Sequence, residues 1–159
     1  MGMSFVVALS NKVYHPQQLS TLQDDFRLKS MEPTGESVFN GHLRMNATEW
    51  TMSVCYGEKG TVIICPASGV AESTRVRKAS VGGKTALITY NDNAMFCYIS
   101  VFEDEAAIAD IVYADGMIQF GVVNGDVFSY ARSLFGEITG TDFGDYIDGE
   151  KVYNYKFSI

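Results

Sequence analysis

The chain has 159 residues, of which 47% are hydrophobic, and it carries a formal net charge of −7. This length fits a single domain, and the hydrophobic content excludes a disordered chain. The apolar runs are too short to cross a membrane, and the N-terminal segment lacks the basic flank of a signal peptide. Three cysteines, an odd number, are typical of a reducing compartment, so we expect a cytoplasmic protein.

Acidic residues are concentrated in the C-terminal half of the chain. Residues 1–91 carry nine Lys or Arg and seven Asp or Glu, a balance of +2, whereas residues 92–159 carry three and twelve, a balance of −9. This asymmetry predicts an acidic face that attracts a basic protein partner and repels nucleic acid. The alternative interpretation is that the acidic residues only keep the protein soluble.

Apolar runs and alternating patterns between turn residues predict that most of the chain forms strands. We expect strands at residues 4–10, 50–56, 61–65, 73–80, 85–90, 94–102, 108–114, 117–123 and 153–159. Residues 29–37, which contain a proline and a glycine, are predicted to be a loop. A four-residue turn over 57–60 would place Cys55 opposite Val62 rather than opposite Cys65, which predicts free, buried thiols.

Two segments have a helical pattern. Residues 17–28 carry an apolar stripe after Pro16, and proline is suited to the first helical position. Residues 127–135 carry a second stripe, with Asp126 placed to cap the N-terminus and Gly136 placed as a left-handed C-cap. The second helix is too short to be stable alone, so it needs packing against a sheet.

The dipeptide Asp115-Gly116 lies between two apolar runs and predicts a β-hairpin, because its tight turn needs positive φ at both central residues. In that hairpin the expected facing pairs are Tyr113 with Ile118 and Ile111 with Phe120. The competing interpretation is a short helix over 105–114 with Asp104 as its N-cap. We favour the hairpin.

These elements predict an α+β fold with a single domain: a mostly antiparallel sheet or half-barrel meander with two helices packed on one side. We divide it into an N-terminal layer with the first helix at residues 1–83, a central meander plus helix at residues 84–136, and an acidic loop with the C-terminal strand at residues 137–159. That last strand is expected beside the first strand or inside the meander, because a terminal strand is ordered only when it is paired.

Three short motifs have some features of functional sites but lack the required spacing. Residues 82–85 end like a phosphate-binding loop, but Lys78 stands where that pattern needs its first glycine, and a strand rather than a helix follows. The basic cluster at residues 75–78 is interpreted as a charged edge strand. The acids at 142, 145, 148 and 150 do not match the ligand spacing of a calcium loop. No metal or cofactor is therefore expected.

For nucleophilic catalysis the candidates are the three cysteines, with His15 and His42 as the bases available at neutral pH. No serine lies in a nucleophile-elbow pattern, and the two histidines lack the spacing of zinc ligands. No catalytic residue is therefore assigned.

The leading hypothesis is a non-catalytic protein-binding module, such as an inhibitor, an immunity protein or a secretion chaperone, that uses its acidic face. The side chains expected to contact the partner are acidic or aromatic: Asp115, Asp142, Asp145, Tyr146, Asp148, Glu150, Tyr153 and Tyr155. One alternative is a small-molecule-binding protein or enzyme with its site in a concave, aromatic-lined sheet. A second alternative is a self-assembling structural protein that pairs edge strands into a homo-oligomer.

Overall fold

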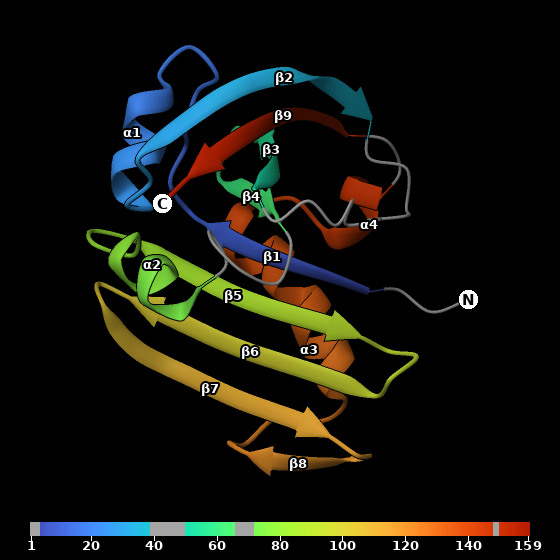
Figure 1. Ribbon diagram of the computed structural model, residues 1–159. Helices are drawn as coiled ribbons and strands as arrows, with labels where there is room; N and C mark the ends of the chain where they lie inside the picture. Colours follow the sequence, from blue (N-terminus) through green and yellow to red (C-terminus); the bar gives the residue numbers. More distant parts are fainter. Residues whose placement is uncertain (1–3, 39–49, 66–71, 148–149) are drawn as a thin grey trace.

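The computed structural model describes residues 4–38, 50–65, 72–147 and 150–159. Nine strands form one antiparallel sheet in the order β2-β9-β3-β4-β1-β5-β6-β7-β8 (Figure 1). The strands are β1 (Ser4–Ser10), β2 (Ser30–Val38), β3 (Thr51–Tyr56), β4 (Thr61–Ile64), β5 (Lys84–Asn91), β6 (Phe96–Glu103), β7 (Ala106–Ala114), β8 (Met117–Phe120) and β9 (Lys151–Ser158). The predicted α+β fold built on a mostly antiparallel sheet is confirmed.

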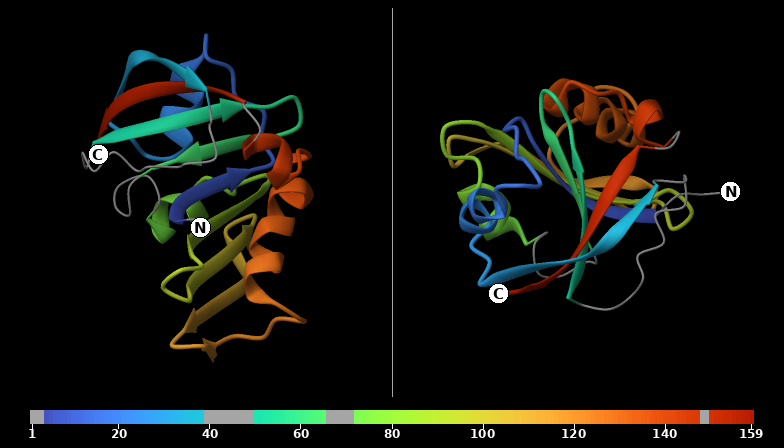
Figure 2. Two further views of the ribbon diagram at one scale, coloured as in Figure 1. Left: turned by 90° about the vertical axis from the view of Figure 1, so that its right-hand side faces the viewer. Right: turned by 90° about the horizontal axis from the view of Figure 1, so that it is seen from above.

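Helices cover both faces of this sheet (Figure 2). One face carries α3 (Val127–Leu134), the π-helix η2 (Phe135–Thr139) and α4 (Phe143–Ile147). The other face carries α1 (Leu19–Asp25) and α2 (Ser73–Lys78). Among the described residues, no helix combines the length and the apolar character needed to cross a membrane.

The need for helices on both faces follows from strand β1. Phe5, Val7 and Leu9 belong to the core under α3, whereas Val6 and Ala8 belong to the core under α1 and α2. The expectation that both predicted helices pack on one side is therefore wrong. Because the central strands are apolar on both faces, each face needs its own covering layer.

Two predictions about strands β2 and β9 are wrong. Residues 29–37, expected to be a loop, lie mostly in the edge strand β2, whose ladder with β9 shifts register between Pro33 and Gly35. A bulge on an edge strand accommodates proline, which has no backbone donor. The C-terminal strand β9 lies between β2 and β3, not beside the first strand or inside the meander.

Residues 73–80, expected to be an edge strand, form α2 instead. Val76 and Ala79 are both fully buried, and their spacing of three fits a helix rather than a strand. The Glu72 side chain accepts a hydrogen bond from the Thr74 backbone nitrogen at 3.0 Å and caps the N-terminus. The basic side chains of the last turn complement the negative end of the helix.

The β7–β8 hairpin is confirmed, with positive φ at both central residues of its turn. Tyr113 pairs with Ile118, as predicted. The second predicted pair is wrong, because Phe120 lies opposite Val112 rather than Ile111. A bulge between the two pairs shifts the register by one residue.

Helix α3 begins at the predicted cap. Asp126 Oδ2 accepts hydrogen bonds from the backbone nitrogen of Ser129 at 2.9 Å and from its hydroxyl at 2.8 Å. Gly136 is not the C-cap, because helix α3 continues directly into η2. The C-cap of η2 is Gly140, which has a φ of 76°. The buried side chains of η2 extend the helical cover over the sheet.

Gly60 lies where the turn between β3 and β4 meets β1 and η2. A Cβ at this position would lie 2.6 Å from the Ser10 carbonyl oxygen and 2.6 Å from the Thr139 Cα. Because both neighbours are backbone atoms, we expect Gly60→Ala to lower the free energy of unfolding by about 1–3 kcal/mol in urea denaturation. Gly144→Ala is the matched control, since a Cβ there meets nothing within 4 Å. Equal stability of the two variants would contradict the prediction.

Hydrogen bonds from Ser129 hold the pKa of the Asp126 carboxyl below its usual value. A lowered folded-state pKa stabilises the protein above the unfolded-state pKa of about 3.9, and this stabilisation is lost as pH falls through the folded-state pKa. Asp126→Asn keeps a capping oxygen but removes the charge. We expect it to lower the free energy of unfolding at pH 7 by about 0.3–1 kcal/mol. The difference in the free energy of unfolding between the variant and the unsubstituted protein should shrink at pH 3. A difference that does not depend on pH would contradict the charged capping role of Asp126.

Candidate functional site

The turn between β3 and β4 and the segment after η2 border one hollow of about 430 Å³. Its lining comes from three parts of the chain: Cys55, Tyr56, Gly57, Glu58, Lys59, Gly140, Thr141 and Glu150. We call it the acidic hollow. Glu58 and Glu150 are both exposed and are brought to the same hollow from opposite halves of the chain.

Backbone geometry holds the two sides of the acidic hollow together. The backbone nitrogen of Gly57 donates to the Gly60 carbonyl at 3.0 Å and closes the turn that carries Glu58. Gly140 has a φ of 76°, and a Cβ on it would lie 2.8 Å from the Cβ of Lys59. Only glycine adopts this conformation readily and allows the Lys59 stem to pack so closely. The turn and the end of η2 therefore form one surface.

The carboxylates around the acidic hollow form no ion pair with another described residue. Within the part of the chain that the structure describes, no ion pair involves Glu58, Glu150, or the exposed Asp142 and Asp145 nearby in the sequence. Acids elsewhere are neutralised in four pairs: Lys12 with Asp25 at 3.5 Å, Lys78 with Glu105 at 3.1 Å, Lys84 with Glu137 at 3.7 Å, and Lys151 with Glu36 at 2.9 Å. The acidic hollow therefore offers negative charge to an external cation.

The structure brings together some of the predicted contact residues. Glu150 lines the acidic hollow, and Asp142 and Asp145 are exposed at the start of α4. Tyr146 belongs to α4, and Asp148 lies outside the described residues. Glu58 was not among the predicted residues, because only the packing of its turn against η2 places it there.

Three other predicted residues do not join this surface. Asp115 lies in the β7–β8 turn, separated from β3 by β4, β1, β5 and β6. Tyr153 is half-buried, with its ring 5.3 Å from that of Tyr56. Tyr155 is 2% exposed, and its hydroxyl lies 2.7 Å from the Tyr56 hydroxyl. The expectation that Tyr155 is an exposed contact residue is therefore wrong.

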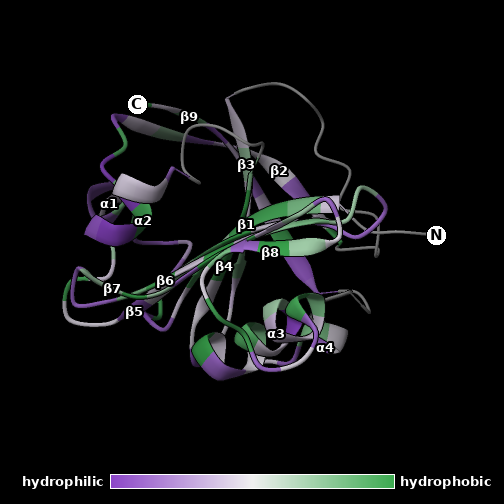
Figure 3. Ribbon diagram, turned by 90° about the horizontal axis from the view of Figure 1, so that it is seen from below, coloured by the Kyte–Doolittle hydropathy of each residue, from purple (hydrophilic) through white to green (hydrophobic). Residues whose placement is uncertain are grey.

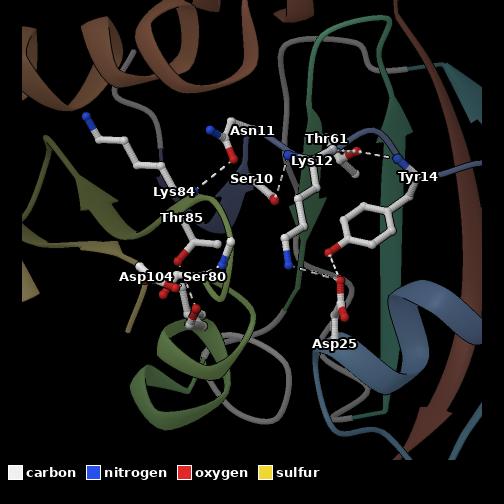
Figure 4. Close-up of polar contacts among 12 residues, drawn as sticks. Ser10, Asn11, Lys12, Tyr14, Asp25, Thr61, Ser80, Lys84, Thr85 and Asp104 are labelled. Atoms are coloured by element: carbon white, nitrogen blue, oxygen red, sulfur yellow. Dashed lines mark hydrogen bonds and ion pairs between the residues drawn. The ribbon is translucent and has the colours of Figure 1, made fainter. Parts of the chain in front are cut away.

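A second polar cluster follows the end of β1 (Figure 4). The Tyr14 hydroxyl donates to Asp25 at 2.5 Å, and the Lys12 ammonium lies 3.5 Å from the same carboxylate. Burial and this hydrogen bond raise the pKa of Tyr14. Thr61 Oγ1 donates to the Lys12 carbonyl at 3.0 Å. These contacts tie α1 to β1 and β4, so we assign the cluster a structural role.

The glycine-rich segment at 82–85 is used for internal contacts. The Gly82 backbone nitrogen donates to Asp104 at 3.1 Å, and the Thr85 hydroxyl donates to the Val76 carbonyl at 2.8 Å. The backbone nitrogen of Lys84 donates to Asn11 at 2.8 Å (Figure 4). These groups hold α2 and the β6–β7 turn against the sheet, which opposes their use as a phosphate-binding loop.

The cysteines are not placed for nucleophilic catalysis. All three are free and buried, and Cys55 lies opposite Val62 as predicted. Burial raises the pKa of both Cys55 and Cys97 to about 12. A thiol with such a pKa is protonated near neutral pH and is a poor nucleophile. His15 is exposed in a loop, and His42 lies outside the described residues.

Metal binding has no support in the part of the chain that the structure describes, where no three His, Cys, Asp or Glu side chains could hold one ion. Comparison with protein-family models, curated proteins and solved structures finds no match. The surface of this chain is therefore the basis for assigning its function.

The burial of all three cysteines and the raised pKa of Cys55 and Cys97 predict slow alkylation of the folded protein. We expect iodoacetamide at pH 8 to leave the cysteines unmodified in buffer and to label all three in urea, as counted by intact-mass spectrometry. Rapid labelling of Cys55 or Cys97 in the native state would instead reveal a reactive thiol and would favour an enzyme.

Proposed function

We propose that the protein is a non-catalytic protein-binding module whose acidic hollow binds a basic segment of its partner. The observation that carries this proposal is the convergence of Glu58 and Glu150 on one hollow without a partner cation among the described residues. Such carboxylates accept charge-assisted hydrogen bonds from lysine or arginine, which are stronger than hydrogen bonds between neutral groups.

The charge distribution supports the same class of partner. Residues 92–159 carry a balance of −9, so a basic segment is attracted before contact and nucleic acid is repelled. Lys59 is the single cation among the described residues that line the hollow, and its charge opposes that of the two carboxylates. Its removal should therefore strengthen binding, whereas removal of either carboxylate should weaken it.

The biological roles that fit such a module are an inhibitor, an immunity protein or a chaperone acting in the cytoplasm. The free thiols are consistent with that reducing compartment. The alternative is a small-molecule-binding protein or enzyme with its site in a concave, aromatic-lined sheet. The C-terminal tyrosines lend it no support, because Tyr155 is buried and the rings of Tyr56 and Tyr153 pack against each other.

The proposal is tested with a fluorescent octalysine peptide as a probe of basic segments. We expect Glu58→Gln/Glu150→Gln to weaken its binding by about 2- to 30-fold at 20 mM NaCl, since each of the two exposed ion pairs contributes about 0.2–1 kcal/mol. Lys59→Met should strengthen binding. All differences should diminish at 500 mM NaCl, because salt screens exposed charges.

The matched control is Glu32→Gln/Glu103→Gln, which changes the net charge equally at two exposed positions away from the hollow. Equal weakening by the two double variants would show attraction to overall charge rather than to the hollow and would contradict the proposal. The same three variants, used as baits in extracts of the source cells, should recover the physiological partner in the same order of efficiency.

A further inference from the structure

Among the strands that the structure describes, β8 is the last of the sheet and pairs only with β7. Figure 3 looks toward this edge of the sheet, where β8 is drawn largely in the colour of hydrophobic residues. Of the eleven exposed large apolar side chains on the described residues, five lie on or beside this hairpin: Ile108, Met117, Ile118, Phe120 and Val122. Residues 116–125 contain no charged side chain. We call β8 and residues 121–125 the uncharged edge.

The opposite edge of the sheet has a different composition. Strand β2 carries the exposed acids Glu32 and Glu36, contains Pro33, and is interrupted by a bulge after that proline. Charges, proline and bulges are the devices that prevent an edge strand from pairing with another chain. The uncharged edge shares one of these devices, a bulge between Ile118 and Phe120, but it has no charged residue and no proline, and Phe120 is 60% exposed.

We propose that the uncharged edge pairs antiparallel with the same edge of a second copy of this chain. A two-fold symmetric contact uses the same surface on both subunits, so each side must complement itself. Strand addition joins two sheets through backbone hydrogen bonds, and apolar cross-strand pairs add stability. This surface is separate from the acidic hollow, from which β1, β5, β6 and β7 divide it.

The bulge in β8 makes the edge self-complementary. Met117 pairs with Ala114 and Phe120 pairs with Val112, two residues of β7 that lie on the same face. Met117 and Phe120 therefore share a face as well. With the two-fold axis between Ile118 and Gln119, Met117 of each copy lies opposite Phe120 of the other, which forms two equal pairs of methionine with an aromatic ring.

Charge also favours a second copy in this orientation. The chain carries −7 overall, so two copies repel unless they meet where charge is absent. In the antiparallel register Asp115 of one copy is level with Val122 of the other, which separates the two aspartates by seven residues, ~23 Å along the strand. That distance exceeds the Debye length of about 8 Å at physiological ionic strength, so their repulsion is screened.

The test is the mass of the full chain in solution. Strand β8 has only four residues, so the contact is small and the dimer should be weak. Sedimentation velocity should show a mass of 17.5 kDa at about 1 µM and about twice that mass at about 200 µM. The dimer should persist at 500 mM NaCl, because its contact is apolar. A monomer throughout this range, or a dimer that salt dissociates, would overturn the proposal.

Substitutions locate the contact and its register. Phe120→Glu and Met117→Lys should each raise the dimer dissociation constant about tenfold or more. The control Val38→Lys introduces a charge on the opposite edge of the sheet, where Val38 is 60% exposed, as Met117 and Phe120 are. This control should leave the dimer dissociation constant unchanged. When the two hairpin variants are mixed, one pair becomes lysine with glutamate and the other stays apolar, so dimers should return as heterodimers. Circular dichroism confirms that each variant is folded. A dimer unaffected by the hairpin variants, or a mixture that stays monomeric, would overturn the proposed pairing.

Discussion

Burial of the central strands on both faces is the constraint on which the rest of the structure depends. Strand β1 pairs with β4 and β5 and supplies side chains alternately to two hydrophobic cores. An antiparallel sheet with one face exposed to solvent would need helices on the other face only. Here neither face of β1 can contact water without exposing apolar residues, so the chain places α1 and α2 on one face and α3, η2 and α4 on the other. The acidic hollow exists because of this second layer, since it forms where η2 meets the β3–β4 turn.

An aromatic cluster connects the C-terminal helices to the first strand. The ring of Phe5 stacks on Tyr90 with centroids 4.6 Å apart and contacts Phe135 and Phe143 at 6.1 and 5.8 Å. Such pairs add about 0.5–1.5 kcal/mol each beyond the area they bury. They fix η2 and the start of α4 against β1. The position of Gly140 and Thr141 in the hollow therefore depends on the same contacts that close the core.

Local features of this fold can be predicted from sequence, whereas long-range pairings cannot. The Asp115-Gly116 turn, the Asp126 cap and the pairing of Cys55 with Val62 depend on a few neighbouring residues, and all three are present. The place of β9 between β2 and β3 depends on strands about a hundred or more residues away, and no local pattern encodes it. The candidate site divides in the same way. The acids near α4 follow from composition, whereas Glu58 joins them only through tertiary packing.

The acidic hollow and the uncharged edge lie at separate parts of one sheet, so the two proposed contacts are compatible with each other. Four strands divide the β3–β4 turn from β8, so pairing through β8 leaves the hollow of each subunit open. A continuous sheet would hold the two hollows on one body. A partner with two basic segments could then bind both, and the second contact would form at a high effective concentration. On the proposed function, each hollow would supply only weak, salt-sensitive attraction, since exposed ion pairs contribute little individually. If both proposals hold, duplication of the hollow by self-pairing would be a physical reason for one protein to combine a charged surface with an edge free of charge.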